Sequence, residues 1–166
     1  MKNYRFILIC VLLLIAQVFL DNYFPLRRYV LISILPAIIL LISLETRSIV
    51  SMFLAFAVGF AVDFFSTGML GISSLALVPV GLVRGAVVGL VFGDELSARG
   101  DELSIQRLGV PKMALASLLL CALYFAIYVW VDSAGTVSFW PAALRFVLSV
   151  AVSTPVCLFA ARLLRP

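Results

Sequence analysis

Long, uninterrupted apolar runs recur along nearly the whole chain and limit its fold more than any other feature. In lipid, only helices and closed barrels satisfy every backbone hydrogen bond. Barrel strands alternate apolar and polar residues, whereas these runs are continuous. With 64% hydrophobic and 12% charged residues among 166, the chain is far more apolar than a soluble domain. The sequence therefore predicts an all-α integral membrane protein with a single polytopic domain.

Six of these runs are predicted to cross the membrane as helices, which puts both termini on one side. Lysine and arginine are enriched on the cytoplasmic side of membrane proteins, so both termini and the polar loop at 93–111 are expected in the cytoplasm. The predicted spans are approximately 6–20, 29–44, 49–63, 72–92, 112–131 and 141–164. The basic residues on the side of the termini are Lys2, Arg5, Arg47, Arg99, Arg107, Lys112, Arg162 and Arg165, against Arg27 and Arg28 on the other.

A single acidic residue, Asp63, lies at the break between the third and fourth runs. It is surrounded by Gly59, Gly68 and Gly71, and these four residues are predicted to shape the turn. A lone carboxylate in an apolar setting is costly unless it is hydrogen-bonded, protonated or paired. Asp63 therefore caps a helix end, marks the water interface of an ordinary turn, or pairs with a buried cation.

Two arginines inside the apolar runs are the candidate partners of Asp63. Arg84 lies within the fourth run and Arg145 within the sixth. From the helical rise, Arg145 lies close to the depth of Asp63, and the Arg84 side chain leans toward it. An ion pair with either arginine would hold the third helix against another, although Arg145 has the alternative of extending to the membrane surface.

Four glycines in and just after the fourth run, Gly81, Gly85, Gly89 and Gly93, are each four residues apart and fall on one helix face. Glycine is common in membrane helices, but this register favours a face for close helix packing. The partner is a helix of this chain or of another protein; the pattern does not distinguish them.

Three interior prolines, Pro36, Pro79 and Pro155, lie in the second, fourth and sixth runs, one in each. Proline inside a helix produces a kink. Kinks in alternate helices would open a cavity or shape the packing between helices.

The remaining polar and aromatic residues point to few further sites. Histidine is absent, and Cys10, Cys121 and Cys157 lie inside apolar runs, so neither a disulfide framework, a metal site nor a cofactor is expected. The aromatic group from Tyr124 to Trp130 is typical of a membrane interface. A seven-residue repeat, GDELSAR followed by GDELSIQ, begins at Gly93 and forms either an interfacial helix or a solvated loop. The basic residues form no stripe, so nucleic acid is not an expected partner.

The stretch from Gly59 to Gly71, GFAVDFFSTGMLG, follows a span with a proline and a tight turn at Glu45 to Ser48. This stretch resembles the signature of the rod shape-determining membrane protein family MreD, whose members also have six short spans and cytoplasmic termini. The resemblance implies a fold similar to that of the substrate-binding membrane subunits of energy-coupling-factor transporters. It does not extend to the loop at 93–111 or to the four glycines of the fourth run.

The resemblance also implies a function, that of a non-enzymatic scaffold of the bacterial cell-elongation complex in the inner membrane. Such a scaffold binds MreC, a single-span protein, and helps to link the actin-like MreB to the RodA glycosyltransferase and its transpeptidase partner during peptidoglycan synthesis. The alternative is a substrate-binding membrane subunit of a vitamin-type transporter, with Asp63, Arg145, Gln17 and the prolines lining an outer cavity. An enzyme is not expected, because Ser66 and Thr67 beside Asp63 lack a positioned base. A homodimer is left open.

Overall fold

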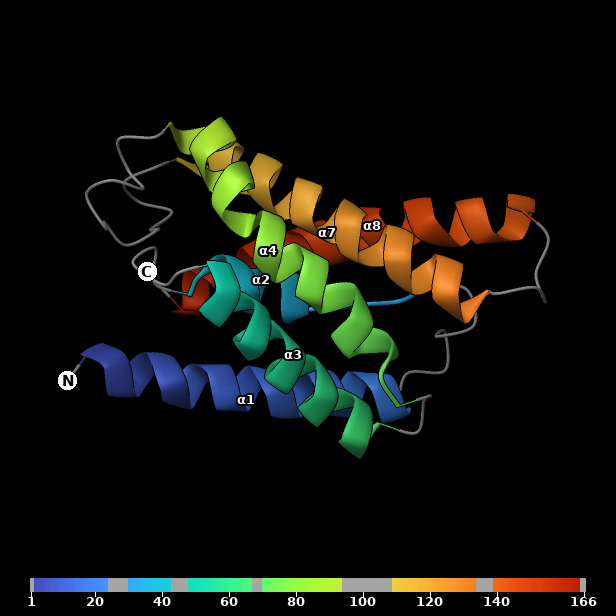
Figure 1. The fold of residues 1–166 in the computed structure, drawn as a ribbon, viewed down its shortest axis with the longest axis horizontal. Coiled ribbons are helices and arrows are strands. Elements are labelled where there is room, and N and C mark those ends of the chain that lie inside the picture. Colours follow the sequence, from blue (N-terminus) through green and yellow to red (C-terminus); the bar gives the residue numbers. More distant parts are fainter. Residues whose placement is uncertain are drawn as a thin grey trace.

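The computed structural model describes residues 2–23, 30–42, 48–66, 70–93, 109–133 and 139–164. These residues form a bundle in which α1, α3 and α7 run in one direction and α4 and α8 run in the opposite one (Figure 1). The start of α1 and the end of α8 therefore lie at the same end of the bundle. The helices are α1 (Lys2–Tyr23), α2 (Leu35–Leu40), α3 (Ser48–Phe65), α4 (Ile72–Phe92), α7 (Val110–Asp132) and α8 (Phe139–Leu164).

Four of these helices, α3, α4, α7 and α8, are long and apolar enough to cross a membrane. The chain is thus a multi-pass helical membrane protein, as its composition predicts. The prediction of six spanning helices is confirmed for these four only. The first run is helical, but its apolar part, Ile7–Tyr23, is shorter than a typical span.

The second predicted span, 29–44, is not a continuous helix. Residues 30–33 form an extended segment outside any helix, and Ile34, with φ of −91° and ψ of −14°, already has helical dihedral angles and caps the helix that follows, which has only 6 residues. Pro36 lies in the first turn of that helix, so the predicted interior kink at this position is wrong. In a continuous helix, Pro36 would lack a backbone donor and its ring would clash with the carbonyl of Ile32. Alternate residues of the extended segment are β-branched, which also favours this conformation.

The other two prolines lie where the sequence predicts them. Pro79 is inside α4 and Pro155 is inside α8. Each removes one backbone N–H from its helix, so the carbonyl four residues earlier loses its usual helical partner.

The short helix α2 is the centre of the core. It contacts each of the other five helices in the described part of the chain, and Figure 1 shows it enclosed between α3, α4 and α8. All of its residues are buried, and Ile39 and Leu40 are 0% exposed. The long helices are therefore packed around a helix that is too short to span the membrane by itself.

The most extensive helix contact is between α3 and α4, and it is made through small residues. A methyl group added at Gly59 of α3 would lie 2.6 Å from the Cα atom of Ser74. A methyl group added at Gly81 of α4 would lie 2.9 Å from the carbonyl oxygen of Ser51 and 3.0 Å from Cβ of Ala55. Ser51, Ala55 and Gly59 recur every four residues on the buried face of α3. The two backbones can approach this closely only because these side chains are small.

The predicted glycine face of α4 is confirmed as a helix contact at Gly81, and beyond Gly81 it stays a prediction. Gly85 is exposed, and a methyl group there would meet Ser48 Oγ only at 3.9 Å. Gly89 is half-buried. Gly93 lies past the end of α4 and has a φ of 89°, which ends the helix.

Several predicted features lie outside the described residues. These are Gly68, most of the tight turn that precedes α3, and nearly all of the polar loop at 93–111 with its seven-residue repeat.

We expect Gly59→Ala to destabilise the protein, because the added methyl group overlaps backbone atoms of α4 rather than a flexible side chain. Overpacking of this kind costs about 1–3 kcal/mol. The thermal unfolding midpoint in nanodiscs measures the effect. Gly85→Ala is the matched control, since it adds the same methyl group in open space and should not lower the midpoint. Equal midpoints for the two variants would contradict the close α3–α4 contact.

Candidate functional site

Two groups of buried polar side chains lie inside this otherwise apolar bundle. The first, which we call the Asp63 cap, joins the end of α3 to the start of α4. The second, which we call the backbone clamp, consists of Gln17, Ser149, Ser153 and Cys157 around residues 30–34. Buried polar groups in a membrane protein mark its functional or structural sites, so these two groups define the candidate site.

In the Asp63 cap, a carboxylate that is 5% exposed receives the free donors of a helix start. Oδ2 of Asp63 accepts hydrogen bonds from the backbone N–H groups of Gly71 at 3.0 Å, Ser73 at 3.0 Å and Ser74 at 3.3 Å. The Ser74 hydroxyl also donates to Oδ2, at 3.2 Å. The first N–H groups of a helix have no partner within the helix, and its positive end favours an anion. Gly71 has a φ of 98°, which favours glycine at this corner.

The capping interpretation of Asp63 is therefore confirmed, and the predicted ion pair with Arg84 or Arg145 is wrong. Arg145 donates from Nη1 to Oδ2 of Asp132 at 2.5 Å, between the end of α7 and the start of α8. Depth in the membrane suggested the Asp63 pairing, but the start of α4 is only a short loop away in sequence. The unpaired N–H groups at the start of α4 therefore bind the Asp63 carboxylate in place of an arginine.

Arg84 has a different role from the predicted one. It is 3% exposed, and its Nε donates to the carbonyl of Leu40 at 3.1 Å while Nη2 donates to the carbonyl of Ile42. Both carbonyls lie at the end of α2. The last carbonyls of a helix lack helical partners and carry partial negative charge, so Arg84 fixes the end of α2 to α4.

In the backbone clamp, α8 hydrogen-bonds one edge of the extended residues. The Leu31 N–H donates to Ser149 Oγ at 2.9 Å, and the Ser33 N–H donates to Ser153 Oγ at 3.1 Å. The Ser153 hydroxyl donates to the Leu31 carbonyl at 3.3 Å, and the Cys157 thiol donates to the Ser33 carbonyl at 3.4 Å. Four residues of helix rise about 6 Å, close to the roughly 6.6 Å between alternate residues of a strand. A ladder of every fourth residue on α8 therefore matches every second residue of the segment.

The opposite edge of the segment is bound by α1 through a single side chain, Gln17, which is 2% exposed. Its Nε2 donates to the Ile32 carbonyl at 3.0 Å, and its Oε1 accepts from the Ile34 N–H at 2.8 Å. Nε2 also donates to Asp21 Oδ1 at 3.1 Å. A carboxamide presents a donor and an acceptor side by side, as the peptide groups of a neighbouring strand do. Helix side chains thus replace neighbouring strands on both edges, which lets extended backbone exist inside a membrane protein.

Tyr124 of α7 connects the two groups. Its side chain is 3% exposed, and its hydroxyl shares hydrogen bonds with the side chains of Ser73 and Ser33. Tyr128 and Phe125 are also buried, whereas Trp130 is 80% exposed. Three of the four rings therefore face the core and Trp130 faces outward, while the interfacial position of the group stays a prediction.

The polar side chains of both groups hydrogen-bond the backbone of their own chain. Their role is to satisfy the backbone groups of a non-helical segment and of a helix end. Within the described ranges, no group of three or more His, Cys, Asp or Glu side chains is placed to hold a metal ion. Cys121 and Cys157, on α7 and α8, are free thiols with their sulfur atoms 3.5 Å apart.

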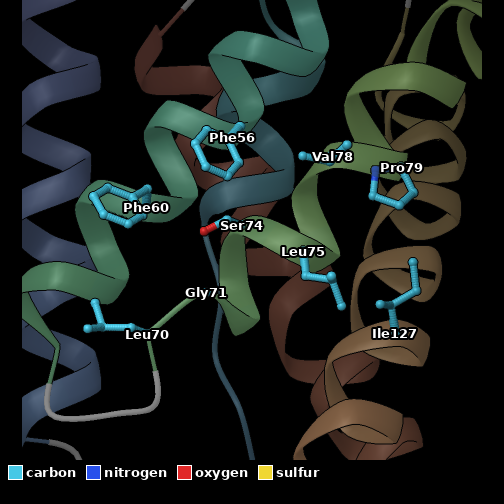
Figure 2. Close-up of a pocket in the computed structure, with 9 residues that line it drawn as sticks. All are labelled: Phe56, Phe60, Leu70, Gly71, Ser74, Leu75, Val78, Pro79 and Ile127. Atoms are coloured by element: carbon cyan, nitrogen blue, oxygen red, sulfur yellow. The ribbon is translucent and has the colours of Figure 1, made fainter.

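An apolar groove of about 590 Å³ lies beside the Asp63 cap, between α3 and α4 with one wall residue from α7 (Figure 2). The predicted polar cavity lined by Asp63, Arg145 and Gln17 is not this groove, since none of the three lines it. The lining residues are Phe56, Phe60, Leu70, Gly71, Ser74, Leu75, Val78, Pro79 and Ile127.

Ser149 and Ser153 are not among the residues predicted from the sequence, although the sequence contains a signal for them. Two serines four residues apart are the main polar side chains of the central part of an apolar helix. Gln17, which binds the opposite edge of the same segment, is predicted only as a cavity residue. Gln17 of α1 and the two serines of α8 are related only through the extended segment that both helices bind, and the sequence predicts a continuous helix there.

Comparison of the chain with protein families, with characterised proteins and with solved structures found no match. The family resemblance of the Gly59 to Gly71 stretch therefore stays a prediction.

We expect Asp63→Ala to destabilise the protein by roughly 3 kcal/mol or more, because it leaves several buried N–H groups without an acceptor. Asp63→Asn keeps one oxygen acceptor and should lose less. The free energy of unfolding in mixed micelles measures both. Asp132→Ala is the control, since it removes a partly exposed ion pair and should cost under about 1 kcal/mol. A loss at Asp63 no larger than at Asp132 would contradict the cap.

Ser153→Ala tests the backbone clamp. It removes an acceptor from the Ser33 N–H and a donor from the Leu31 carbonyl, so we expect a loss of about 1–3 kcal/mol in the free energy of unfolding. The adjacent Thr154→Val is the matched control, because the Thr154 hydroxyl only donates to the Val150 carbonyl in its own helix, at 2.7 Å. If both variants unfold alike, the clamp does not stabilise the extended segment.

Proposed function

We propose that this chain is a non-enzymatic membrane scaffold of the bacterial cell-elongation complex, similar to MreD. The observation that carries the proposal is that the described residues of the stretch resembling the MreD signature, 59–66, 70 and 71, join α3 to the start of α4. Gly59 allows α3 to meet α4 at Ser74, Asp63 caps α4, and Gly71 makes the corner. Each of these residues positions the two helices relative to each other, which is what a scaffold needs.

The polar interior supports the same proposal. Gln17, Asp63 and Arg84 are each at most 5% exposed, and each binds backbone groups of the chain itself. Side chains used in this way define one rigid arrangement of helices. A rigid surface favours stable association with other membrane proteins, because little conformational freedom is lost on binding.

The proposed partners are those of the elongation complex. They are an MreC-like single-span protein and, through it, MreB, RodA and the transpeptidase. We place the protein in the bacterial inner membrane with both termini in the cytoplasm. Arg5, Lys112 and Arg162 support this orientation, since they lie near the start of α1, the start of α7 and the end of α8, which share one end of the bundle (Figure 1).

A substrate-binding subunit of a small-molecule transporter is the second candidate, and the extended segment at 30–33 favours it. Transporters commonly bind substrates where a membrane helix is interrupted near its middle. In this chain the backbone groups of the interruption already bind Gln17, Ser149 and Ser153. A ligand would need to displace these side chains, so the scaffold is the better-supported function.

The experiment that separates the two candidates is purification of the tagged protein from its native membrane into nanodiscs, followed by mass spectrometry of bound proteins and small molecules. We expect stoichiometric recovery of a single-span protein with an extracytoplasmic domain, absent from a control purification of an unrelated multi-pass protein. Recovery of a vitamin or a lipid-linked metabolite together with ATPase subunits, and of no single-span partner, would overturn the scaffold proposal in favour of the transporter.

A further inference from the structure

A row of phenylalanines runs along the outer face of α3. Phe53, Phe56, Phe60 and Phe64 are 71%, 50%, 48% and 65% exposed. Their spacing of three and four residues places them on one helix face, and the rings of Phe56 and Phe60 stack with centroids 6.0 Å apart. We call this row the phenylalanine ridge.

The apolar groove lies directly beside this ridge. Phe56 and Phe60 belong to both features, since they also form the α3 wall of the groove (Figure 2). The opposite wall is formed by Leu75 and Pro79 of α4, with Ile127 of α7 next to them. The protein thus presents a protruding row of rings and a hollow of about 590 Å³ on the same face.

We propose that the occupant of this groove is the phenylalanine ridge of a second copy of the chain. A two-fold interface uses the same patch on both subunits, so the patch must be self-complementary. A ridge next to a groove meets this requirement, because each copy inserts its ridge where the other is hollow. Both copies keep the same orientation in the membrane if the axis is parallel to the membrane normal.

The ridge supplies roughly half to three-quarters of the area that such a dimer needs. A phenylalanine side chain buries about 150–250 Å², so at the exposures of these four rings the ridge offers roughly 350–600 Å² per copy. Leu70 and Leu75, which line the groove and are 65% and 54% exposed, add to this area. A stable interface buries about 800 Å² per partner.

The test is the monomer–dimer equilibrium of the purified protein in liposomes, measured by single-molecule subunit counting at increasing lipid dilution. We expect Phe56→Ala combined with Phe60→Ala to raise the dimer dissociation constant at least about tenfold. Val78→Phe, which fills the groove from its α4 side, should do the same. Phe159→Ala is the matched control, since this ring is 65% exposed on α8. Unchanged thermal midpoints would show that the variants are folded.

Crosslinking identifies the occupant. In a Cys10→Ala background, where Cys121 and Cys157 are buried, Phe60→Cys should give a crosslinked homodimer and Phe159→Cys should not. A monomer at every dilution, with no crosslink, would overturn the proposal and leave lipid as the occupant. A crosslink in native membranes to a different protein alone would overturn it in favour of that partner. Purified protein contains no single-span partner, so this outcome is independent of the elongation-complex proposal.

Discussion

The structure depends on one constraint of the membrane, which is that no water is available to satisfy a backbone that leaves the helix. The chain contains such a backbone in its core, where residues 30–33 are extended and Ile34 caps the start of α2. Its N–H and C=O groups are bound by side chains from α1 and α8, at opposite ends of the sequence. The first and last helices are thereby fixed to the same central segment, and the bundle closes around it.

The two buried charges follow the same constraint at the ends of helices. Asp63 binds the free N–H groups at the start of α4, and Arg84 binds the free carbonyls at the end of α2. In each case the sign of the charge opposes that of the helix end. Charges that looked like an ion pair in the sequence are instead two separate caps, and each one fixes a different helix to its neighbour.

The sizes of the side chains on α3 separate its inner face from its outer face. Small residues at Ser51, Ala55 and Gly59 bring α3 against α4 on the inside. The large rings of α3 are consequently turned outward, where Phe56 and Phe60 border the groove. The dimer proposal depends on the shape of this outer surface, the phenylalanine ridge and the groove beside it, since close helix association in lipid depends on shape more than on hydrophobicity.

The sequence by itself determined the membrane environment, the helical class and the limits of α3, α4, α7 and α8, because apolar runs of this length have few other solutions in lipid. It also located the Asp63 turn, since a carboxylate in an apolar chain must be hydrogen-bonded and the three glycines around it favour a turn. It did not determine the partners of Asp63, Arg84 or Gln17. Those partners are backbone groups that become free only where a helix starts, ends or breaks, and the break before Pro36 is stable only once Ser149 and Ser153 lie beside it. Tertiary packing therefore decided which predicted helix is interrupted and that Gly59 and Gly81 lie in the contact between α3 and α4.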